Sequence, residues 1–369
     1  MKIIHYRPIL VFIFIFALVI LYIQVKCTNK KRMVIECGKI FKERKEVLTQ
    51  QQLDNIVTTR STVLSGRNST LNVDISLFND VNSGFKNQPI VTLFTSFKTD
   101  YAMDSEKVLV YNNTLYNWQT LRPHAQLIFF TKDASAGEKV KFIHWNIFPV
   151  LHYSESGIPA IKDMYKQARE LYNTSWYGYF NGDILLTEDI LETLEYVSSV
   201  SDNFPNASIL IIGRRMNVLN VTSEEVTKMN GIKESARSRG SLYEIDAEDY
   251  FITNRLFPWN KIPEFVIGRA GYDNWIVGHA RCDLGTIVID ATETLTAVHQ
   301  TTSKGGNKEG FAHEDKNYNL ELIKRLKLPK RFLQGLTTCA EWRTVRTIKT
   351  GRIELVKRDD QHKNCKCKK

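Results

Sequence analysis

The stretch Tyr177-Gly-Tyr-Phe-Asn-Gly-Asp-Ile-Leu-Leu186 decides the fold that we predict for this chain. Its first residues are typical of a buried strand, which stops at Asn181-Gly182-Asp183 and is followed by a second apolar run. Asp is rarely buried without a partner, so a carboxylate beside a glycine turn at the end of a core strand adds little to stability. The same placement suits a divalent metal ion held against a phosphate.

Apolar segments on both sides of this stretch alternate between strand and helix patterns. Strands are predicted at 90–96, 126–131, 208–213, 250–253 and 286–290, and helices at 112–121, 158–171, 186–197 and 268–279. Short, continuously apolar strands that alternate with helices predict an α/β fold with a mixed, mainly parallel sheet flanked by helices.

The N-terminal part of the chain differs from this body. Residues 8–25 are almost wholly apolar, long enough to cross a bilayer, and are not followed by small residues at a cleavage position. We therefore expect a cytoplasmic tail at 1–7, an uncleaved transmembrane signal-anchor at 8–25 and a polar stem at 26–87. The globular domain is expected at 88–335, with a basic C-terminal tail at 336–369.

Glycosylation sequons and cysteines bear on the cellular compartment. Asn-X-Ser/Thr sequons begin at Asn68, Asn112, Asn173, Asn206 and Asn220, and together with the anchor they indicate a body in the secretory lumen. The six cysteines lack paired C-x-x-C spacing, which argues against a zinc site. In an oxidising lumen, a disulfide between Cys282 and Cys339 is our expectation.

The formal net charge of +10 raises the question of nucleic acid binding. Part of the positive charge is concentrated beside the membrane segment and in residues 343–369, and no nucleic-acid-binding motif accompanies it. We expect no nucleic acid partner.

Polar side chains follow several of the predicted strands directly. They lie at Thr95-Ser96, Thr131-Lys132-Asp133, Asn181-Gly182-Asp183 and Arg214-Arg215. Ligands of α/β sheets bind beyond the carboxyl ends of the strands, so these groups predict a site for a phosphorylated ligand. A carboxylate oxygen suits Mg²⁺ or Mn²⁺, and arginines stabilise charge on a departing diphosphate.

Five segments carry a resemblance to a known group of enzymes. Phe180-Asn-Gly-Asp-Ile-Leu-Leu, Ile-Ile-Gly-Arg-Arg, Gly-Arg-Ala-Gly-Tyr-Asp-Asn-Trp, Val-Ile-Asp-Ala-Thr and Thr-Ala-Val-His-Gln occur in this order. In that order they resemble nucleotide-diphospho-sugar transferases of the GT-A fold, over roughly residues 88–320. The resemblance implies a metal- and diphosphate-binding Asp-X-Asp element, which Asn181-Gly182-Asp183 matches with Asn in the first place. The resemblance therefore implies that Asp183 is a metal ligand. It implies that Asn181 hydrogen-bonds the ribose or coordinates the metal ion weakly.

The resemblance also implies roles for residues later in the chain. Asp273 matches an acidic residue at a helix start that faces the acceptor sugar as general base, although Asp is also common in the first turn of a helix. His299 matches a histidine that completes the metal shell, although a lone histidine among apolar residues is more often a hydrogen-bonded core residue.

Four further residues are expected at the donor site. Thr95 is expected at the nucleotide diphosphate. Of Arg214 and Arg215, both candidates for this site, one is expected to meet the diphosphate and the other a surface carboxylate, and the sequence does not distinguish them. Arg269, in a glycine-flanked turn, is expected to meet a sugar or phosphate oxygen or to form a salt bridge.

These expectations combine into a type II glycosyltransferase of the Golgi membrane, with the endoplasmic reticulum as the alternative. It uses a nucleotide-sugar donor and Mn²⁺ or Mg²⁺, and a glycan or glycoprotein acceptor. One alternative is a non-catalytic lumenal protein on the same fold that binds a glycan or a nucleotide. The other is a glycoside hydrolase that uses two carboxylates and no nucleotide.

Overall fold

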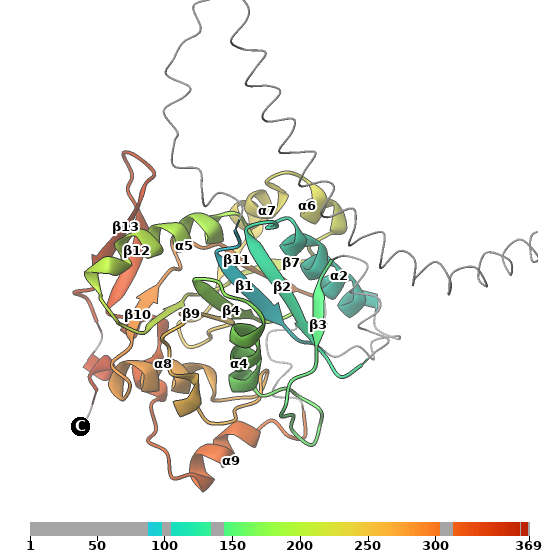
Figure 1. The fold of residues 1–369 in the computed structure, drawn as a ribbon. Coiled ribbons are helices and arrows are strands. Elements are labelled where there is room, and N and C mark those ends of the chain that lie inside the picture. The colour runs from blue at the N-terminus through green and yellow to red at the C-terminus, as the bar shows by residue number, and fades with distance from the viewer. Residues whose placement is uncertain (1–87, 98–104, 134–143, 303–312, 362, 368–369) are drawn as a thin grey trace, which may run out of the picture. The chain divides into compact units, whose positions relative to one another are not determined.

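A computed structural model describes residues 88–369 except 98–104, 134–143, 303–312, 362 and 368–369 (Figure 1). The described residues belong to one compact unit, Asn82–Lys369. The expected tail, anchor and stem at 1–87 lie outside the described residues. Within the described part, no helix has the length and apolar character needed to span a membrane.

The described elements alternate between strands and helices along the chain. The strands are β1 (Val91–Thr95), β2 (Ala125–Phe130), β3 (Asn146–Phe148), β4 (Trp176–Phe180), β5 (Ile184–Leu186), β6 (Ile209–Ile212), β7 (Met216–Leu219), β8 (Ser241–Leu242), β9 (Tyr250–Asn254), β10 (Ile287–Asp290), β11 (Ala297–Thr301), β12 (Trp342–Arg346) and β13 (Ile353–Lys357). The helices are α2 (Ser105–Gln119), α4 (Ile161–Leu171), α5 (Asp189–Val200), α6 (Ser223–Thr227), α7 (Gly231–Arg239), α8 (Asp273–Cys282) and α9 (Tyr318–Arg325).

The main sheet is mixed and mainly parallel, as the sequence predicts. Among the described residues it has nine strands in the order β13-β12-β10-β6-β9-β4-β1-β2-β3. The pairs β4–β1, β1–β2, β2–β3, β6–β10 and β10–β12 are parallel. β9 lies between β4 and β6 and runs antiparallel to both, with Phe180 opposite Tyr250. The start of β9 therefore meets the carboxyl end of β4.

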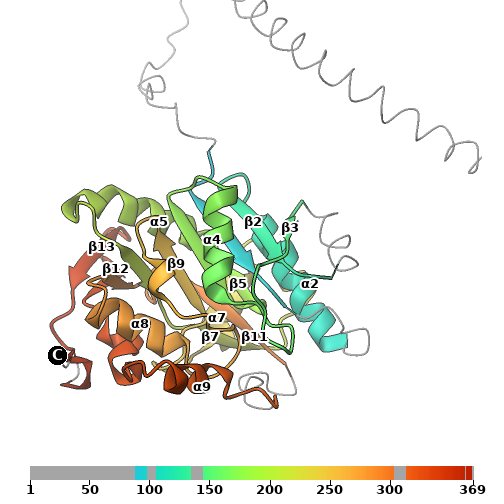
Figure 2. The same cartoon turned by 60° about the horizontal axis from the view of Figure 1, so that its bottom comes forward.

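Helices cover both faces of this sheet (Figures 1 and 2). Because successive side chains of a strand point to opposite faces, Tyr177 and Tyr179 of β4 pack with α4 and α8, whereas Trp176 and Phe180 pack with α2 and α5. Each face buries a contiguous apolar cluster. Central strands that are buried on both faces account for the continuous apolar runs in the sequence.

A second sheet has the strand order β5-β11-β7-β8, and two of its strands follow strands of the main sheet after short connections. β5 follows β4 through Asn181-Gly182-Asp183, and β7 follows β6 through Gly213-Arg214-Arg215. β11 joins them, antiparallel to β5 and parallel to β7. In this register His299 lies opposite Ile184, beside the glycine turn.

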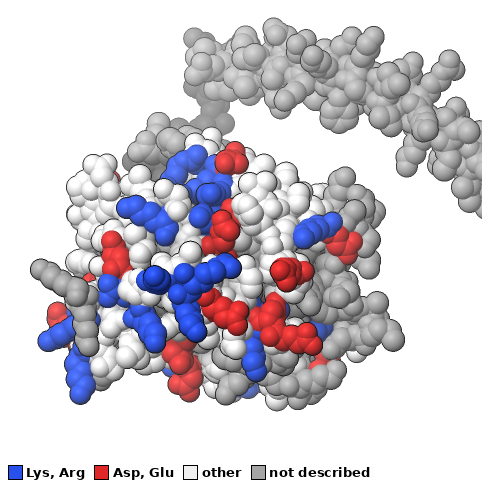
Figure 3. Space-filling view, turned by 90° about the horizontal axis from the view of Figure 1, so that it is seen from below, with Lys and Arg blue, Asp and Glu red and all other residues white. Residues whose placement is uncertain are grey.

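The C-terminal residues 336–369 do not form the separate basic tail that we expected. β12 and β13 extend the main sheet. Thr344 in β12 is fully buried, and Ile353 in β13 is buried as well. Basic side chains of this segment pair with acidic ones: Arg346 with Glu192, and Arg358 with Asp290. On the face seen in Figure 3, Lys and Arg lie among Asp and Glu instead of forming one continuous basic surface.

The disulfide pairing that we expected is wrong. Cys282 bonds to Cys367 and Cys339 bonds to Cys365, with Cα–Cα distances of 5.3 and 5.1 Å. The fold brings the last turn of the chain against α8 and the segment before β12. This proximity is not visible in the sequence, because spacing alone does not define disulfide connectivity.

Both disulfides are expected to stabilise the fold by restricting the unfolded chain. Replacement of Cys365 with Ser should lower the free energy of unfolding by about 2–5 kcal/mol, measured by urea denaturation. Peptide mapping without reduction should recover the pairs Cys282–Cys367 and Cys339–Cys365. Recovery of a Cys282–Cys339 peptide instead would contradict the structure.

Candidate functional site

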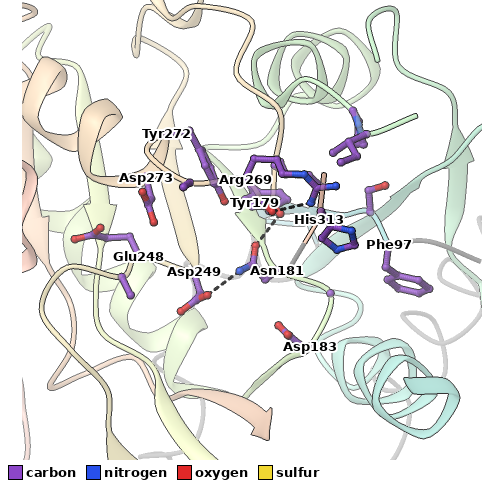
Figure 4. A pocket seen from close by; sticks show the side chains of 18 of the residues that line it. Phe97, Tyr179, Asn181, Asp183, Glu248, Asp249, Arg269, Tyr272, Asp273 and His313 are labelled. Atoms are coloured by element: carbon purple, nitrogen blue, oxygen red, sulfur yellow. Dashed lines mark hydrogen bonds between the residues drawn. The ribbon is translucent and has the colours of Figure 1, made fainter. Parts of the chain in front are cut away.

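A pocket of about 890 Å³ lies where β1, β2 and β4 end. Its walls come from the residues after these strands, from residues 243–249 before β9, and from the loop 267–274 that leads into α8 (Figure 4). The carboxyl edge of a parallel sheet is where α/β folds bind ligands. Here the antiparallel strand β9 adds its own starting residues to that edge.

The glycine of the Asn181-Gly182-Asp183 turn is required by a close approach. A Cβ atom at position 182 would lie 2.7 Å from Cδ1 of Phe97, which follows β1. Phe97 is itself held by stacking on Tyr111 of α2, with ring centroids 4.1 Å apart. A side chain at position 182 would therefore displace an aromatic wall of the pocket.

Asp183 and His299 meet across β5 and β11. Nε2 of His299 lies 3.1 Å from Oδ2 of Asp183, and Nδ1 of the same ring lies 3.1 Å from the Thr301 hydroxyl. His299 is 2% exposed, whereas Asp183 is about one third exposed to the pocket. Burial alone would raise the pKa of Asp183, but His299 and Arg215 outweigh it and lower this pKa below its ordinary value.

Asn181 is bonded on both sides of its amide. Its Oδ1 accepts a hydrogen bond of 2.8 Å from the Tyr179 hydroxyl, and its Nδ2 donates one of 2.7 Å to Oδ1 of Asp249. Arg215 donates to the same Oδ1 at 2.6 Å, and both members of that ion pair are more than nine-tenths buried. Arg215 also donates to Asn217 and lies over the Tyr243 ring, so its guanidinium is fixed in the pocket wall.

Two further carboxylates lie near the start of α8. Burial raises the pKa of Asp273 to about 7, and the negative charge of Asp249 adds to the rise, while hydrogen bonding to the backbone of Asn274 opposes it. Burial, and then the charge of Asp273, raises the pKa of Glu248 well above its usual value. Glu248 accepts hydrogen bonds of 2.9 Å from Asn274 and Thr337. In Figure 4, Glu248, Asp249 and Asp273 lie together on one side of the pocket.

Most of the residues singled out from the sequence line this one pocket. They are Asn181, Gly182, Asp183, Arg215, Arg269, Asp273 and His299. Two others do not line it. Thr95 is fully buried in β1, one residue before the pocket begins at Ser96. Arg214 is not among the lining residues, and its Nε donates to the Tyr243 carbonyl at 2.6 Å.

The structure places Arg269 in a salt bridge at the pocket wall. Its Nε lies 2.6 Å from Oδ1 of Asp315, and its Nη1 donates to the Gly268 carbonyl. The salt bridge that we expected as one alternative is present, and contact of Arg269 with a sugar or phosphate oxygen stays a prediction.

Glu248 and Asp249 were not among the site residues predicted from the sequence. The polar residues expected at the site follow strands, whereas Glu248 and Asp249 precede β9. An antiparallel strand brings its first residues to the carboxyl edge of its neighbours. The available signal was a pair of adjacent carboxylates immediately before the apolar run Tyr250-Phe-Ile-Thr253.

The chemistry of the Asp183 side chain fits a divalent cation. Its Oδ1 is buried without a hydrogen-bond partner in the described structure, and a buried carboxylate oxygen needs a donor or a cation. Within the described ranges, no group of three or more His, Cys, Asp or Glu side chains is placed to hold a metal ion. Mg²⁺ is commonly held by one or two protein carboxylates together with substrate phosphates, and Asp183 supplies one such carboxylate. Nε2 of His299, which lies beside Asp183, would complete the protein side of the site.

Comparisons with known proteins give distant structural matches only. No family model matches the chain, and no curated protein matches it. S. aureus TarS 1–349 in complex with UDP-GlcNAc is 14% identical over 67% of this chain and 70% of that chain, with a TM-score of 0.35. The mannosyltransferase PcManGT from Pyrobaculum calidifontis, in complex with GDP-Man and Mn²⁺, is 10% identical over 66% of each chain, with a TM-score of 0.36.

A third match is a CMP:2-keto-3-deoxy-manno-octonic acid synthetase complexed with CTP, 10% identical over 65% of this chain and 98% of that chain, with a TM-score of 0.31.

The raised pKa of Asp273 predicts a pH-dependent stability. The folded protein holds a proton on this carboxyl up to about pH 7, whereas the unfolded chain releases it near pH 4. Stability contributed by the protonated form is therefore lost as the pH rises through this window. The difference in unfolding free energy, Asp273→Asn minus wild type, should be larger at pH 8 than at pH 5 by about 2 kcal/mol, after allowance for partial exposure.

Urea denaturation at the two pH values measures this difference, with the exposed Asp202→Asn as control. An equal difference at pH 5 and pH 8 for Asp273→Asn would show that Asp273 has an ordinary pKa.

Proposed function

We propose that the protein is a glycosyltransferase that moves a sugar from a nucleotide-diphosphate donor to a hydroxyl of a glycan or glycoprotein. One observation carries the proposal. A single pocket at the carboxyl edge of the sheet joins the Asp183–His299 pair and Arg215 to Asp273, whose pKa is about 7. The first three groups suit a diphosphate, and the fourth suits a hydroxyl that must lose its proton. The ordered resemblance to GT-A transferases supports the same assignment.

The donor side of the pocket is built for a diphosphate. Asp183 and His299 would hold Mn²⁺ or Mg²⁺, which when bound neutralises charge on the diphosphate oxygens. Arg215 is fixed in the wall by Asp249 and Asn217, so its guanidinium does not have to be ordered when a diphosphate binds. The absence of a side chain at Gly182 lets the chain turn closely beside Phe97.

The acceptor side is built around Asp273. With a pKa of about 7, this carboxyl is a stronger base than an ordinary aspartate and is still partly ionised at neutral pH. In the reaction, the acceptor oxygen forms a bond to the anomeric carbon, and the bond from that carbon to the diphosphate breaks. Asp273 takes the proton of the acceptor hydroxyl, and the diphosphate leaves with the bonding electron pair.

The function is tested by a screen of common nucleotide-sugars with the purified full-length protein, with and without Mn²⁺. At least one donor should raise the melting temperature and be turned over in the presence of a suitable glycan. Asp183→Asn should reduce turnover by about 100-fold or more, because the developing charge on the diphosphate loses its cation. Asp163→Asn is the control, since the Asp163 carboxylate is likewise paired with a histidine, His152, but does not line the pocket.

The same screen separates the rival functions. Asp273→Asn should retain donor binding and lose turnover in a transferase. A binding protein would show no turnover in any variant, and a glycoside hydrolase would act on a glycan without a nucleotide. Failure of every donor to bind or turn over, with or without Mn²⁺, would overturn the proposal.

We also propose the cellular setting of a single-pass type II protein of the Golgi membrane, with the catalytic domain in the lumen. Three features support it: the apolar run at 8–25, the two disulfides, and the sequons. The four sequon asparagines within the described residues, Asn112, Asn173, Asn206 and Asn220, are all exposed. Exposure makes each of them accessible for modification.

Expression of the full chain in animal cells tests this setting. The protein should fractionate with membranes, be protected from external protease, and shift to lower mass after enzymatic removal of N-glycans. Replacement of all four exposed asparagines with Gln should remove most of that shift. Protease sensitivity of the intact vesicles, with no glycan shift, would place the domain on the cytoplasmic side.

A further inference from the structure

Asn181 stands where the resemblance to GT-A transferases implies an acidic residue. A neutral amide brings no charge to a cation, and hard divalent cations prefer carboxylate oxygens. Both polar ends of this amide are already used, by Tyr179 and by Asp249. Asn181 therefore links the two strands, and a second negative charge beside that of Asp183 must come from another residue.

Asp249 lies beside that position because of strand register. β9 pairs antiparallel with β4, with Phe180 opposite Tyr250, so the next pair outward is Asn181 and Asp249. The backbone confirms it, since the amide of Asn181 donates to the Asp249 carbonyl at 2.9 Å. The side chains then bond at 2.7 Å. An acidic residue at 181 would set one carboxylate against another at this distance, which is strongly unfavourable.

One oxygen of Asp249 has no partner in the described structure. Arg215 and Asn181 both donate to Oδ1, whereas Oδ2 is buried without a hydrogen bond. Asp183, across the turn, has the same feature at its Oδ1. Two buried carboxylate oxygens without donors, both on residues that line one pocket, are costly unless something positive binds there. Figure 4 shows the two side chains flanking Asn181.

The ion pair with Arg215 does not by itself explain Asp249. It accounts for Oδ1 only, and Arg215 has further partners in Asn217 and the Tyr243 ring. A purely structural Arg–Asp pair is available for comparison in the same sheet. Arg358 and Asp290 are also 2.6 Å apart and similarly buried, but there Oδ1 of Asp290 also accepts from Thr292, and neither residue lines the pocket.

We propose that Asp249 supplies the negative charge that an acidic residue at position 181 would otherwise bring, and that Asn181 is the amide partner that holds it there. The cation and diphosphate site then carries two carboxylates, Asp183 from the turn after β4 and Asp249 from the start of β9. This inference rests on the proposed function. Asp249 would position the cation through its negative charge. In the Asn181–Asp249 pair, the first carboxylate of the Asp-X-Asp element would thus come from β9 instead of from position 181.

Exchange of the carboxylate and the amide between positions 249 and 181 tests this proposal. The free Mn²⁺ signal in electron paramagnetic resonance measures affinity for Mn²⁺ alone, and then with UDP or GDP, for the full-length protein and its variants. Asp249→Asn should weaken Mn²⁺ binding about tenfold or more, a loss of the size typical for groups that support a metal site. Asn181→Asp alone should destabilise the protein, because it sets two carboxylates together.

The double variant Asn181→Asp with Asp249→Asn keeps one carboxylate and one amide and should recover Mn²⁺ affinity to within about threefold of wild type, a non-additivity expected for residues in contact. Asp290→Asn is the matched control for loss of a buried Arg–Asp pair and should bind Mn²⁺ normally. Circular dichroism of each variant checks that it is folded.

The proposal is overturned if Asp249→Asn binds Mn²⁺ as tightly as wild type, or if the double variant binds no better than Asp249→Asn. Sugar transfer that persists in excess chelator would overturn this inference and leave the proposed transferase standing. Binding of Mn²⁺ that depends on Asp249, with no donor turned over, would support this inference and count against the transferase.

Discussion

The pairing of β9 with β4 is the constraint on which the site depends. β4 is the strand that ends in Asn181-Gly182-Asp183, and β9 is the antiparallel strand inserted beside it in the otherwise parallel centre of the main sheet. Because β9 runs the other way, its first residues reach the edge where the neighbouring strands end. That reversal brings Glu248 and Asp249 into a pocket that parallel strands alone would leave without them.

The electrostatics of the pocket follow from this arrangement. Glu248, Asp249 and Asp273 are held close together away from bulk water, and burial raises the pKa of all three. Asp183 differs, because His299 and Arg215 face it and lower its pKa. At neutral pH the raised pKa values cost stability, whereas the lowered pKa of Asp183 contributes to it. Carboxyl groups with opposite pKa shifts in one pocket are typical of sites where one group takes up a proton and another stays charged.

The second sheet and the C-terminal segment support the same edge. β11 sets His299 beside Asp183, and Thr337, two residues before a disulfide-bonded cysteine, donates to Glu248. The segment that we expected to be a separate basic tail therefore supports the pocket indirectly, through the hydrogen bond from Thr337 to Glu248. Its role depends on long-range contacts, which the local pattern of lysines and arginines in the sequence does not report.

The sequence by itself determined the strands and helices that flank Asn181-Gly182-Asp183, because apolar periodicity and glycine turns are local properties of the chain. It also identified Asp183, His299, Arg215 and Asp273 as residues able to share a site, through motif order and position after strands. The antiparallel direction of β9, the disulfide partners, and the placement of Glu248 and Asp249 became visible only in the folded chain. Each of these depends on which distant segments lie side by side, and that is set by packing of the whole core.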